Sequence, residues 1–391
     1  MSAVLDGVRV LEAANFVSGP YACQMLAEYG ADVLKVENPN GGDPFRNFSP
    51  DRYGPTFCAH NRHKRSITLD LSKPEGAALF RRIAAGVDVV VENFRPGVLD
   101  RLGIGYSSLV EQNPRLIYCA ISGFGPTGPY RHRPAYDTVI QALSGLLGQC
   151  LPPDNPRIAG PNFADSVSSL YAVSGIMGAL YERERTGKGR RVDVPMIDTM
   201  IGFLTNPIGQ FFAHGTTPGP YQRASHSQCF VFRCADQRMI SIHMSAPQKF
   251  WESLLESIGR PELKEDERFL TNPLRIKNYE ELGRVLEPSF ARKPRDAWAK
   301  ILEENDVPYA PVNDFEDVLR DPQIQHLGTI TETRHPQMGV VKGLERPVFY
   351  DGERRFATRP PPTLGEHTDE VLREIGLSAQ EIAALHESKT V

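Results

Sequence analysis

The sequence predicts an α/β protein whose main sheet is largely parallel. Over the first two hundred residues, short apolar runs of strand length alternate with amphipathic segments of helical length. Strands that are separated by helices form βαβ units, and such units build parallel sheets with helices on their faces. The chain has 391 residues, more than one hydrophobic core usually supports, so we expect a second, smaller α/β domain.

The expected elements of the first half follow this alternation. Gly30 ends the first helix, and Pro74 suits the first position of another because the N–H that proline lacks would have no helical partner there. Strands are expected at residues 7–12, 31–36, 66–71, 87–91, 116–121 and 191–194. Helices are expected at residues 20–29, 74–85, 167–183 and 197–204, with a helical turn at 96–102.

The second half of the sequence predicts the smaller domain and the two segments that connect it to the large domain. Residues 206–223 are rich in Gly, Pro and Phe and have no clear period, whereas prolines recur over residues 307–362. A strand is expected at 238–242, with helices at 247–257, 295–304, 368–375 and 378–387. We therefore place a large domain at 1–200 (completed by about 345–391), a linker at 201–225, a small domain at 226–305 and a return linker at 306–344.

Composition excludes several classes of protein. A net charge of −4 and an isoelectric point of about 6.2 give no electrostatic basis for nucleic-acid binding. The six cysteines are scattered without a CxxC motif, so we interpret them as buried thiols of a reducing compartment. The N-terminus lacks a basic stretch followed by an apolar one, and no apolar run is long enough to span a membrane. We expect a cytoplasmic protein that binds neither nucleic acid nor membrane.

Three short motifs resemble ligand sites but do not fit them. Residues 123–128 match GxGxxG after a strand, but three prolines within 126–134 prevent the helix that a dinucleotide site requires. Residues 186–189 lack the spacing and the Ser/Thr of a P-loop. His60 and His63 have no accompanying acid, so a surface pair is favoured over a metal site. No metal is expected.

Basic residues gather in three places, at 62–65, 95–101 and 131–133. We expect all three clusters near one edge of the sheet, because ligands of parallel sheets bind beyond the carboxyl ends of the strands. Clustered cations on a chain of net negative charge would attract a phosphorylated small molecule. A solvated rim is the simpler interpretation of any one cluster.

Asp165 lies where a Gly/Pro-rich loop becomes a helix. In one interpretation it caps that helix, its oxygen accepting a backbone N–H of the first turn. In the other, the same N–H groups and the helix dipole keep the carboxylate ionised, so that it can act as a nucleophile. Position alone favours the cap.

Many short motifs occur in one order along nearly the whole chain. They are LDGVRVL at 5–11, GP at 19–20, GADVLKVE at 30–37, Asn61 with KRSI at 64–67, VENFRPG at 91–97, YD at 136–137, QALSG at 141–145, Asp165, TGKG at 186–189 and GEHTDE at 365–370. With these motifs the chain resembles the class III CoA-transferases, a family that includes formyl-CoA transferase and carnitine CoA-transferase. In this resemblance Asp165 matches the family's catalytic aspartate, which does not exclude the cap.

The resemblance implies a large Rossmann-like domain and a small domain joined by two long linkers. Two such chains interlock, so it also implies an obligate homodimer. The C-terminal helices are implied to rejoin the first domain.

The resemblance implies an acyl-CoA:carboxylate CoA-transferase. Ionised Asp165 attacks the thioester, giving a mixed anhydride and then an aspartyl-CoA thioester, and the acceptor acid reverses these steps. One thioester replaces another, so ATP, metal and permanently bound cofactor are not needed, and coenzyme A enters as the thioester substrate. The backbone N–H groups of Val17 and Ser18 are implied oxyanion donors. The implied CoA site consists of Leu69, Asp70, Leu71, Asn93, Phe94, Arg95, Arg101 and Tyr136.

Two features differ from the formyl/oxalate branch of that family. The branch has a glycine-rich loop where residues 242–248 have no such run, and it has a CoA-contacting arginine where Asn38 stands. The acyl donor and acceptor therefore stay open. His226, Gln228 and His243 are candidates for an acceptor pocket, although each also fits an ordinary surface role.

Three alternatives stay open. An α-methylacyl-CoA racemase of the same fold needs a second acid/base, a histidine just before an aspartate, but residues 135–137 are Ala-Tyr-Asp and His132 is displaced. A non-catalytic CoA-binding protein would bind CoA without turning it over. A hydride-transfer enzyme would change NAD(P)H absorbance without requiring CoA.

Overall fold

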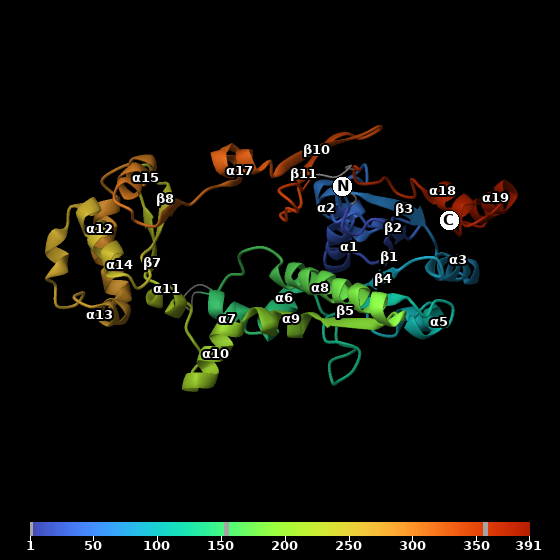
Figure 1. The fold of residues 1–391 in the computed structure, drawn as a ribbon, viewed down its shortest axis with the longest axis horizontal. Helices are drawn as coiled ribbons and strands as arrows, with labels where there is room; N and C mark the ends of the chain where they lie inside the picture. The colour runs from blue at the N-terminus through green and yellow to red at the C-terminus, as the bar shows by residue number, and fades with distance from the viewer. Residues whose placement is uncertain (1–2, 152–155, 355–358) are drawn as a thin grey trace. The chain divides into compact units, whose positions relative to one another are not determined.

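The computed structural model describes residues 3–151, 156–354 and 359–391 (Figure 1). The chain divides into two compact units. Unit 1 comprises Met1–Leu147, Arg157–Gly209 and His326–Val391, and unit 2 comprises Gly148–Pro156 and Gln210–Gln325.

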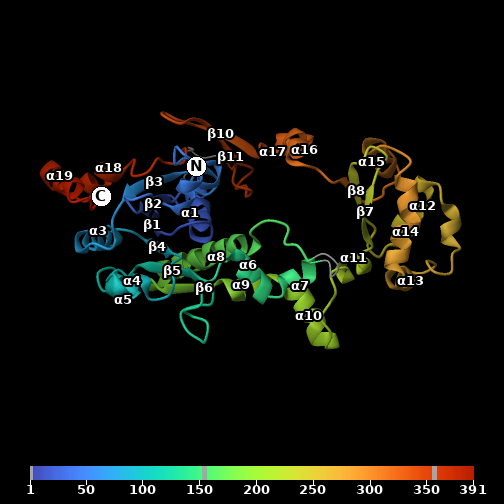
Figure 2. The ribbon, with the colours of Figure 1, turned by 180° about the vertical axis from the view of Figure 1, so that it is seen from behind.

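Unit 1 is built on a six-stranded parallel sheet in the order β3-β2-β1-β4-β5-β6 (Figures 1 and 2). The expected α/β fold with a mainly parallel sheet is confirmed. The chain starts at the centre, builds outward through β2 and β3, and returns to the other side of β1, so the order reverses between β1 and β4. The strands are β1 (Arg9–Ala13), β2 (Asp32–Glu37), β3 (Lys64–Thr68), β4 (Val89–Glu92), β5 (Ile117–Ser122) and β6 (Arg191–Pro195).

Each face of this sheet carries its own hydrophobic core. Successive strand residues point to opposite faces, so Val10 and Leu11 belong to different cores, as do Val89 and Val90. The first face is covered by α1 (Ser18–Glu28), α8 (Phe163–Thr186) and α9 (Met196–Phe203). The second face is covered by α3 (Pro74–Ala84), α4 (Val98–Arg101), α5 (Tyr106–Val110), α18 (Thr368–Glu374) and α19 (Ala379–Glu387).

The C-terminal helices pack on the early part of the chain. In both ribbon views α18 and α19, in red, lie beside β3 and α3 (Figures 1 and 2). The backbone N–H of Thr68 donates to Thr368 Oγ1 over 3.0 Å, and Lys73 Nζ donates to the carbonyl of Lys389 over 3.0 Å. These bonds join residues about three hundred positions apart into one unit.

β3 begins two residues before its expected start, at Lys64 instead of Ser66. Sequence alone gives no reason to place two cations inside a strand, but both side chains are buried against carboxylates. Lys64 Nζ lies 2.7 Å from Glu12 Oε2, and Arg65 pairs with Asp32 over 2.8 Å. Ion pairing from neighbouring elements therefore extends the strand.

α8 is long and apolar enough to cross a membrane by length and composition alone. This differs from the expectation that no apolar run reaches that length. Core helices of globular proteins pass the same test, and half of this helix's most apolar stretch is buried inside the protein.

All six cysteines are free thiols. Four are buried as expected, whereas Cys229 is half-buried and Cys150 is exposed. The buried ones are Cys23, Cys58, Cys119 and Cys234.

Unit 2 contains a three-stranded antiparallel sheet in the order β7-β8-β9, with helices packed around its core. The expected strand and helices are present as β8, α12 and α15. Residues 206–223, expected to be irregular, instead contain most of α10 and the start of α11, because Ile208, Phe211 and Phe212 recur at helical spacing. α10 (Thr205–His214) begins in unit 1 and ends in unit 2. The other elements are α11 (Gln222–His226), β7 (Cys229–Arg233), β8 (Met239–His243), α12 (Gln248–Ile258), α13 (Asn272–Lys277), α14 (Tyr279–Phe290), α15 (Arg295–Glu304) and β9 (Tyr309–Pro311).

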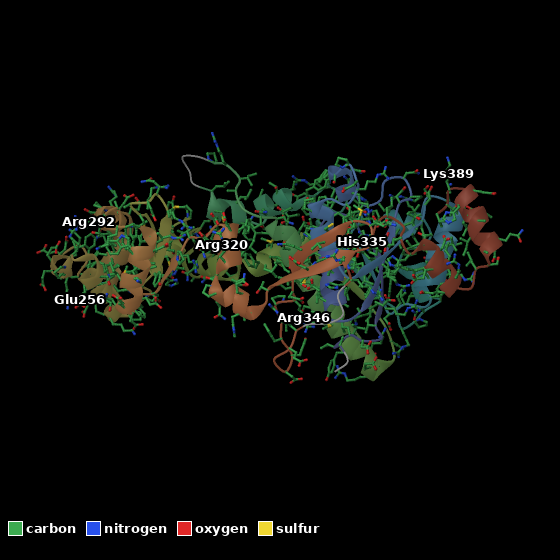
Figure 3. The ribbon with its side chains drawn as sticks, turned by 90° about the horizontal axis from the view of Figure 1, so that it is seen from above. Glu256, Arg292, Arg320, His335, Arg346 and Lys389 are labelled. Atoms are coloured by element: carbon green, nitrogen blue, oxygen red, sulfur yellow. The ribbon has the colours of Figure 1, made fainter. Side chains whose placement is uncertain are left out.

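The proline-rich return segment is also more regular than expected. Pro322 starts a helix and Pro336 lies in a hairpin turn, so these prolines punctuate elements instead of keeping the chain extended. The hairpin belongs to unit 1, and Figure 3 labels His335, the last residue of its first strand, and Arg346, which follows its second strand. His335 Nε2 lies 3.1 Å from Glu366 Oε2, and Arg346 Nη1 donates to the Glu28 carbonyl over 3.1 Å, so the hairpin is bonded to other parts of that unit. The elements are α16 (Phe315–Arg320), α17 (Pro322–Leu327), β10 (Ile330–His335) and β11 (Gly339–Leu344).

Candidate active site

A cavity of about 310 Å³ opens in unit 1 at the carboxyl ends of β1, β4 and β5. These strands flank the point where the strand order reverses, which is where ligands bind in open α/β sheets. Six of the site residues expected from sequence fall in its lining: Ser18, Asn93, Phe94, Arg95, Tyr136 and Asp165.

A larger cavity of about 660 Å³ lies elsewhere in unit 1. Its most buried charged group, Arg65, already pairs with Asp32, Glu370 and Glu374. Because these charges neutralise one another, the larger cavity offers little unpaired charge to bind a ligand. We therefore take the smaller cavity, where Asp165 has no ion-pair partner among the residues that the structure describes, as the candidate active site.

Asp165 is inside the first turn of α8, three residues after the N-cap Asn162. The expectation that it caps the helix is wrong. Within the described residues no hydrogen bond reaches its carboxylate oxygens, although the residue is half-buried and lines the cavity. The carboxylate is therefore free to meet a ligand.

The cap of α8 comes from Asp137, the first residue of α6 (Asp137–Leu143). Its Oδ1 accepts the backbone N–H of Ala164 over 2.8 Å and that of Asp165 over 3.2 Å. Because those donors are taken, they do not hold Asp165 ionised as expected. Burial and the charge of Asp137 instead raise the pKa of Asp165 to about 7.

The turn between β1 and α1 faces the same cavity. Val17 is the N-cap of α1 and Ser18 its first residue, and no hydrogen bond among the described residues uses either backbone N–H. Ser169 lies one helical turn after Asp165, and its Oγ contacts the carbonyl oxygens of Ser18 (2.7 Å) and Asp165 (2.8 Å). The Ser169 hydroxyl thus links the start of α1, with its N–H donors, to Asp165 on α8.

The loop after β4 supplies the next part of the lining. Glu92 Oε2 accepts the backbone N–H of Phe94 over 2.8 Å, which closes a tight turn. Phe94 and Arg95 follow in the cavity wall, and Tyr136 also lines the cavity, with its ring edge-to-face on Phe16 at 6.2 Å between centroids. An aromatic wall with a guanidinium suits a ligand that is part apolar and part anionic.

Four residues of the implied CoA site do not line this cavity. Leu69, Asp70 and Leu71 follow β3, at the far side of β2 from the cavity, and Leu69 is buried in the second core. Arg101 ends α4 and is exposed.

The three candidates for an acceptor pocket belong to unit 2. Gln228 is buried, and its Oε1 accepts from Arg275 Nε over 3.0 Å, so its side chain serves the packing of that unit. His226 Nδ1 lies 2.8 Å from the carbonyl of Gln222. His243 ends β8 and is exposed.

The three basic clusters do not gather at one edge. Arg62, Lys64 and Arg65 surround the amino end of β3 and are buried in ion pairs. Arg131 and Arg133 line the cavity together with Arg95. Sequence spacing could not separate the two groups, because the partners of the first cluster come from other elements.

A buried ionic network supports the turn before α1. Lys35 Nζ donates to Glu12 (2.7 Å), to Asp43 (2.9 Å) and to the carbonyl of Ala14 (2.8 Å). Asp43 in turn accepts the N–H of Phe16 over 3.4 Å. Sequence reasoning missed this network, because these charges lie at ordinary spacing in the sequence.

No group of three or more His, Cys, Asp or Glu side chains suited to a metal ion occurs in the part of the chain that the structure describes. His60 and His63 are each half-buried there. His63 is in a poor position to hold a charge, since burial lowers its pKa to about 4.

Comparison with known proteins shows which family this chain is similar to. The family model for CoA-transferase family III matches residues 5–368. The chain is 33% identical to the succinyl-CoA:glutarate CoA-transferase of Mus musculus, over 95% of this chain and 86% of that protein. It is 32% identical to the formyl-CoA:oxalate CoA-transferase of Rhodopseudomonas palustris (strain HaA2), over 99% of this chain and 97% of that protein.

A solved structure shows the same fold over nearly the whole chain. The CAIB/BAIF family protein from Brucella suis superimposes with a TM-score of 0.86 at 37% identity, covering 96% of this chain and 100% of the other. The chain therefore belongs to CoA-transferase family III and is an enzyme of that family.

Proposed function

We propose that the protein moves CoA between an acyl-CoA and a free carboxylic acid through covalent intermediates on Asp165. The observation that carries the proposal is that the Asp165 carboxylate shares a cavity with the N-terminus of α1, and that among the described residues neither the carboxylate nor the first N–H groups of α1 have a hydrogen-bond partner. A nucleophile and oxyanion donors side by side are what acyl transfer requires.

Each step exchanges one acyl bond for another. The Asp165 carboxylate attacks the thioester carbonyl and expels CoA thiolate, forming a mixed anhydride. The thiolate attacks the aspartyl carbonyl and releases the first carboxylate, leaving an aspartyl-CoA thioester. The acceptor carboxylate attacks this thioester and expels the thiolate again, which then attacks the acceptor's carbonyl to give the new acyl-CoA and free Asp165. The N–H groups of Val17 and Ser18 stabilise the tetrahedral oxyanions.

Coenzyme A is placed with its reactive end in the cavity. Phe94 and Tyr136 offer apolar contact to the pantetheine arm, and Arg95 offers charge to a phosphate. The remaining proposed contacts, which lie outside the cavity, are assigned to the nucleotide end of this long ligand: Leu69, Asp70, Leu71 and Arg101.

The reaction is tested by incubating the protein with succinyl-CoA and a panel of carboxylic acids that includes glutarate and oxalate. New acyl-CoA species formed without ATP, detected by mass spectrometry, support the proposal. Exchange of the α-hydrogen of a branched acyl-CoA for deuterium, with no new thioester, would replace it with a racemase. CoA binding without either reaction would contradict catalysis on Asp165.

The rate is expected to fall as the pH drops below about 7, because only ionised Asp165 attacks. Replacing Asp137 with Asn removes a neighbouring charge but keeps the oxygen that accepts the N–H groups of Ala164 and Asp165. Asp137→Asn is therefore expected to lower the pKa of Asp165 and to move the acid limb of kcat/KM to lower pH. Profiles of both proteins check this, and an unmoved limb would show that the Asp137 charge does not set the profile.

We also propose a homodimer. α8 and α9 leave large apolar side chains exposed on the isolated chain, with Leu170 56%, Tyr181 68% and Phe203 51% exposed. A contact with a second chain would cover these exposed apolar side chains, and this supports the proposal. Sedimentation is expected to show a dimer that persists on dilution, and Tyr181→Glu is expected to weaken it. A stable monomer of the unaltered chain would contradict the dimer.

A further inference from the structure

The side-chain amide of Asn93 joins two loops that form the cavity. Asn93 follows β4, and residues 15–18 follow β1, the neighbouring strand. Asn93 Oδ1 accepts the N–H of Asn15 over 2.9 Å, while Nδ2 donates to the Asn15 carbonyl (2.7 Å) and to Ser18 Oγ (3.1 Å). Both amide hydrogens are thus used inside the protein, and none is left for a ligand.

The turn that Asn93 holds has an unfavourable backbone. Phe16 has φ of 64°, in the left-handed region, which a bulky residue adopts only when its surroundings enforce it. The approach of α1 is equally tight, since a Cβ on Gly19 would lie 2.3 Å from the Cβ of Ala14. In this shape the N–H groups of Val17 and Ser18 have no hydrogen-bond partner in the described part of the chain.

We infer that Asn93 is a positioning residue whose side chain fixes the oxyanion turn, and that it does not contact CoA through its amide. The inference rests on the proposed function for its catalytic meaning, because Val17 and Ser18 matter only if an oxyanion forms. The statement that Asn93 fixes the turn depends only on its three hydrogen bonds to Asn15 and Ser18. Loss of the amide releases the turn, while Phe94 and Arg95 still face the ligand.

Asn93→Ala tests this, with Asn113→Ala as the matched control. Asn113 also clamps a loop, since its Nδ2 donates to the Val87 carbonyl (2.8 Å) and its Oδ1 accepts the N–H of Arg115 (3.2 Å), but it lies outside the cavity lining. Amide hydrogen exchange of the Asn15 N–H, which Asn93 Oδ1 accepts, is expected to become at least about tenfold faster in Asn93→Ala and to stay unchanged in Asn113→Ala.

Measurements of kcat and of the Kd for CoA distinguish a positioning role of Asn93 from a direct contact with CoA. In Asn93→Ala, kcat is expected to fall by roughly 10²-fold, the effect of misplacing catalytic donors, while the Kd for free CoA stays within about twofold of the unaltered protein. If the Asn93→Ala protein does not fold, Asn93→Asp replaces it, because aspartate keeps the accepting oxygen but loses the two N–H donors. Asn93→Asp must then show the same fall in kcat and the same unchanged Kd for CoA. A raised Kd for CoA with unchanged kcat and unchanged exchange would overturn the inference and assign the amide to CoA.

The exchange measurement also separates this inference from the proposed function. It is made on the protein without substrate, so it does not depend on turnover. Slow exchange of the Asn15 N–H that Asn93→Ala abolishes would support the clamp even if the unaltered protein transferred no CoA. Unchanged exchange in an active enzyme would contradict the clamp alone.

Discussion

Replacing Asp165 with asparagine is expected to abolish CoA transfer while the protein stays folded. The substitution keeps the shape of the side chain and removes the nucleophile, so exchange between acyl-CoA and acceptor acid falls by at least about 10³-fold. Asp198 is a matched control, because it occupies the corresponding position in the first turn of α9 but is exposed. Asp198→Asn is expected to keep its activity within about twofold. Normal turnover by Asp165→Asn would remove Asp165 from the mechanism.

The same variant is expected to be more stable at neutral and alkaline pH. The folded protein raises the pKa of Asp165 from 3.8 to about 7, so an ionised Asp165 destabilises the fold, and this penalty grows as the pH rises from about 4 to 7. Asparagine removes it, with an expected gain on the order of 1–3 kcal/mol at pH 8 that shrinks towards pH 4. Urea unfolding at the two pH values measures the difference. A loss of stability at pH 8 would show that the carboxylate is not strained by burial.

Replacing Lys35 with methionine is expected to have the largest effect on stability. Lys35 is fully buried, and although burial opposes its charge, Glu12 and Asp43 raise its pKa above the ordinary value. Methionine fills the same space but leaves those carboxylates without this partner, which costs roughly 3–5 kcal/mol. It also removes the donor to the Ala14 carbonyl, so the turn before α1 loses a support.

Lys342→Met is the control for this prediction. Lys342, on β11 of unit 1, pairs with Glu332 on β10 over 3.5 Å. Unlike Lys35 and its partners, both side chains are largely exposed. Loss of such a pair is expected to cost less than about 1 kcal/mol. Denaturant unfolding of both variants compares the buried network with the surface pair. Equal, small losses would mean that the network contributes little to the fold.

The parallel sheet could be predicted because its strands are apolar and separated by helices. β1, β4 and β5 are buried on both faces, so they stand out as short hydrophobic runs between glycines and prolines. β3 was placed two residues late, since Lys64 and Arg65 look like a solvated edge until their carboxylates are known. α10 was missed because glycine and proline obscured the spacing of its three apolar residues.

The site was predictable only in part, for a related reason. Asp165 stands at a loop-to-helix boundary, and that position is visible in the sequence. That Asp137 takes the cap, and thereby frees and perturbs Asp165, depends on α6 packing against α8 and has no local signal. Asn93 likewise meets Asn15 only because β1 and β4 are neighbours.

The most direct test of the account is to trap the enzyme during turnover. The protein is mixed with succinyl-CoA and an acceptor acid, quenched with hydroxylamine, digested and analysed by mass spectrometry. We expect the peptide containing Asp165 to carry a hydroxamate at that residue, only when acyl-CoA is present and never in Asp165→Asn, because both the anhydride and the aspartyl thioester react with hydroxylamine. An unmodified Asp165 peptide from a sample that is demonstrably exchanging CoA would contradict the covalent route.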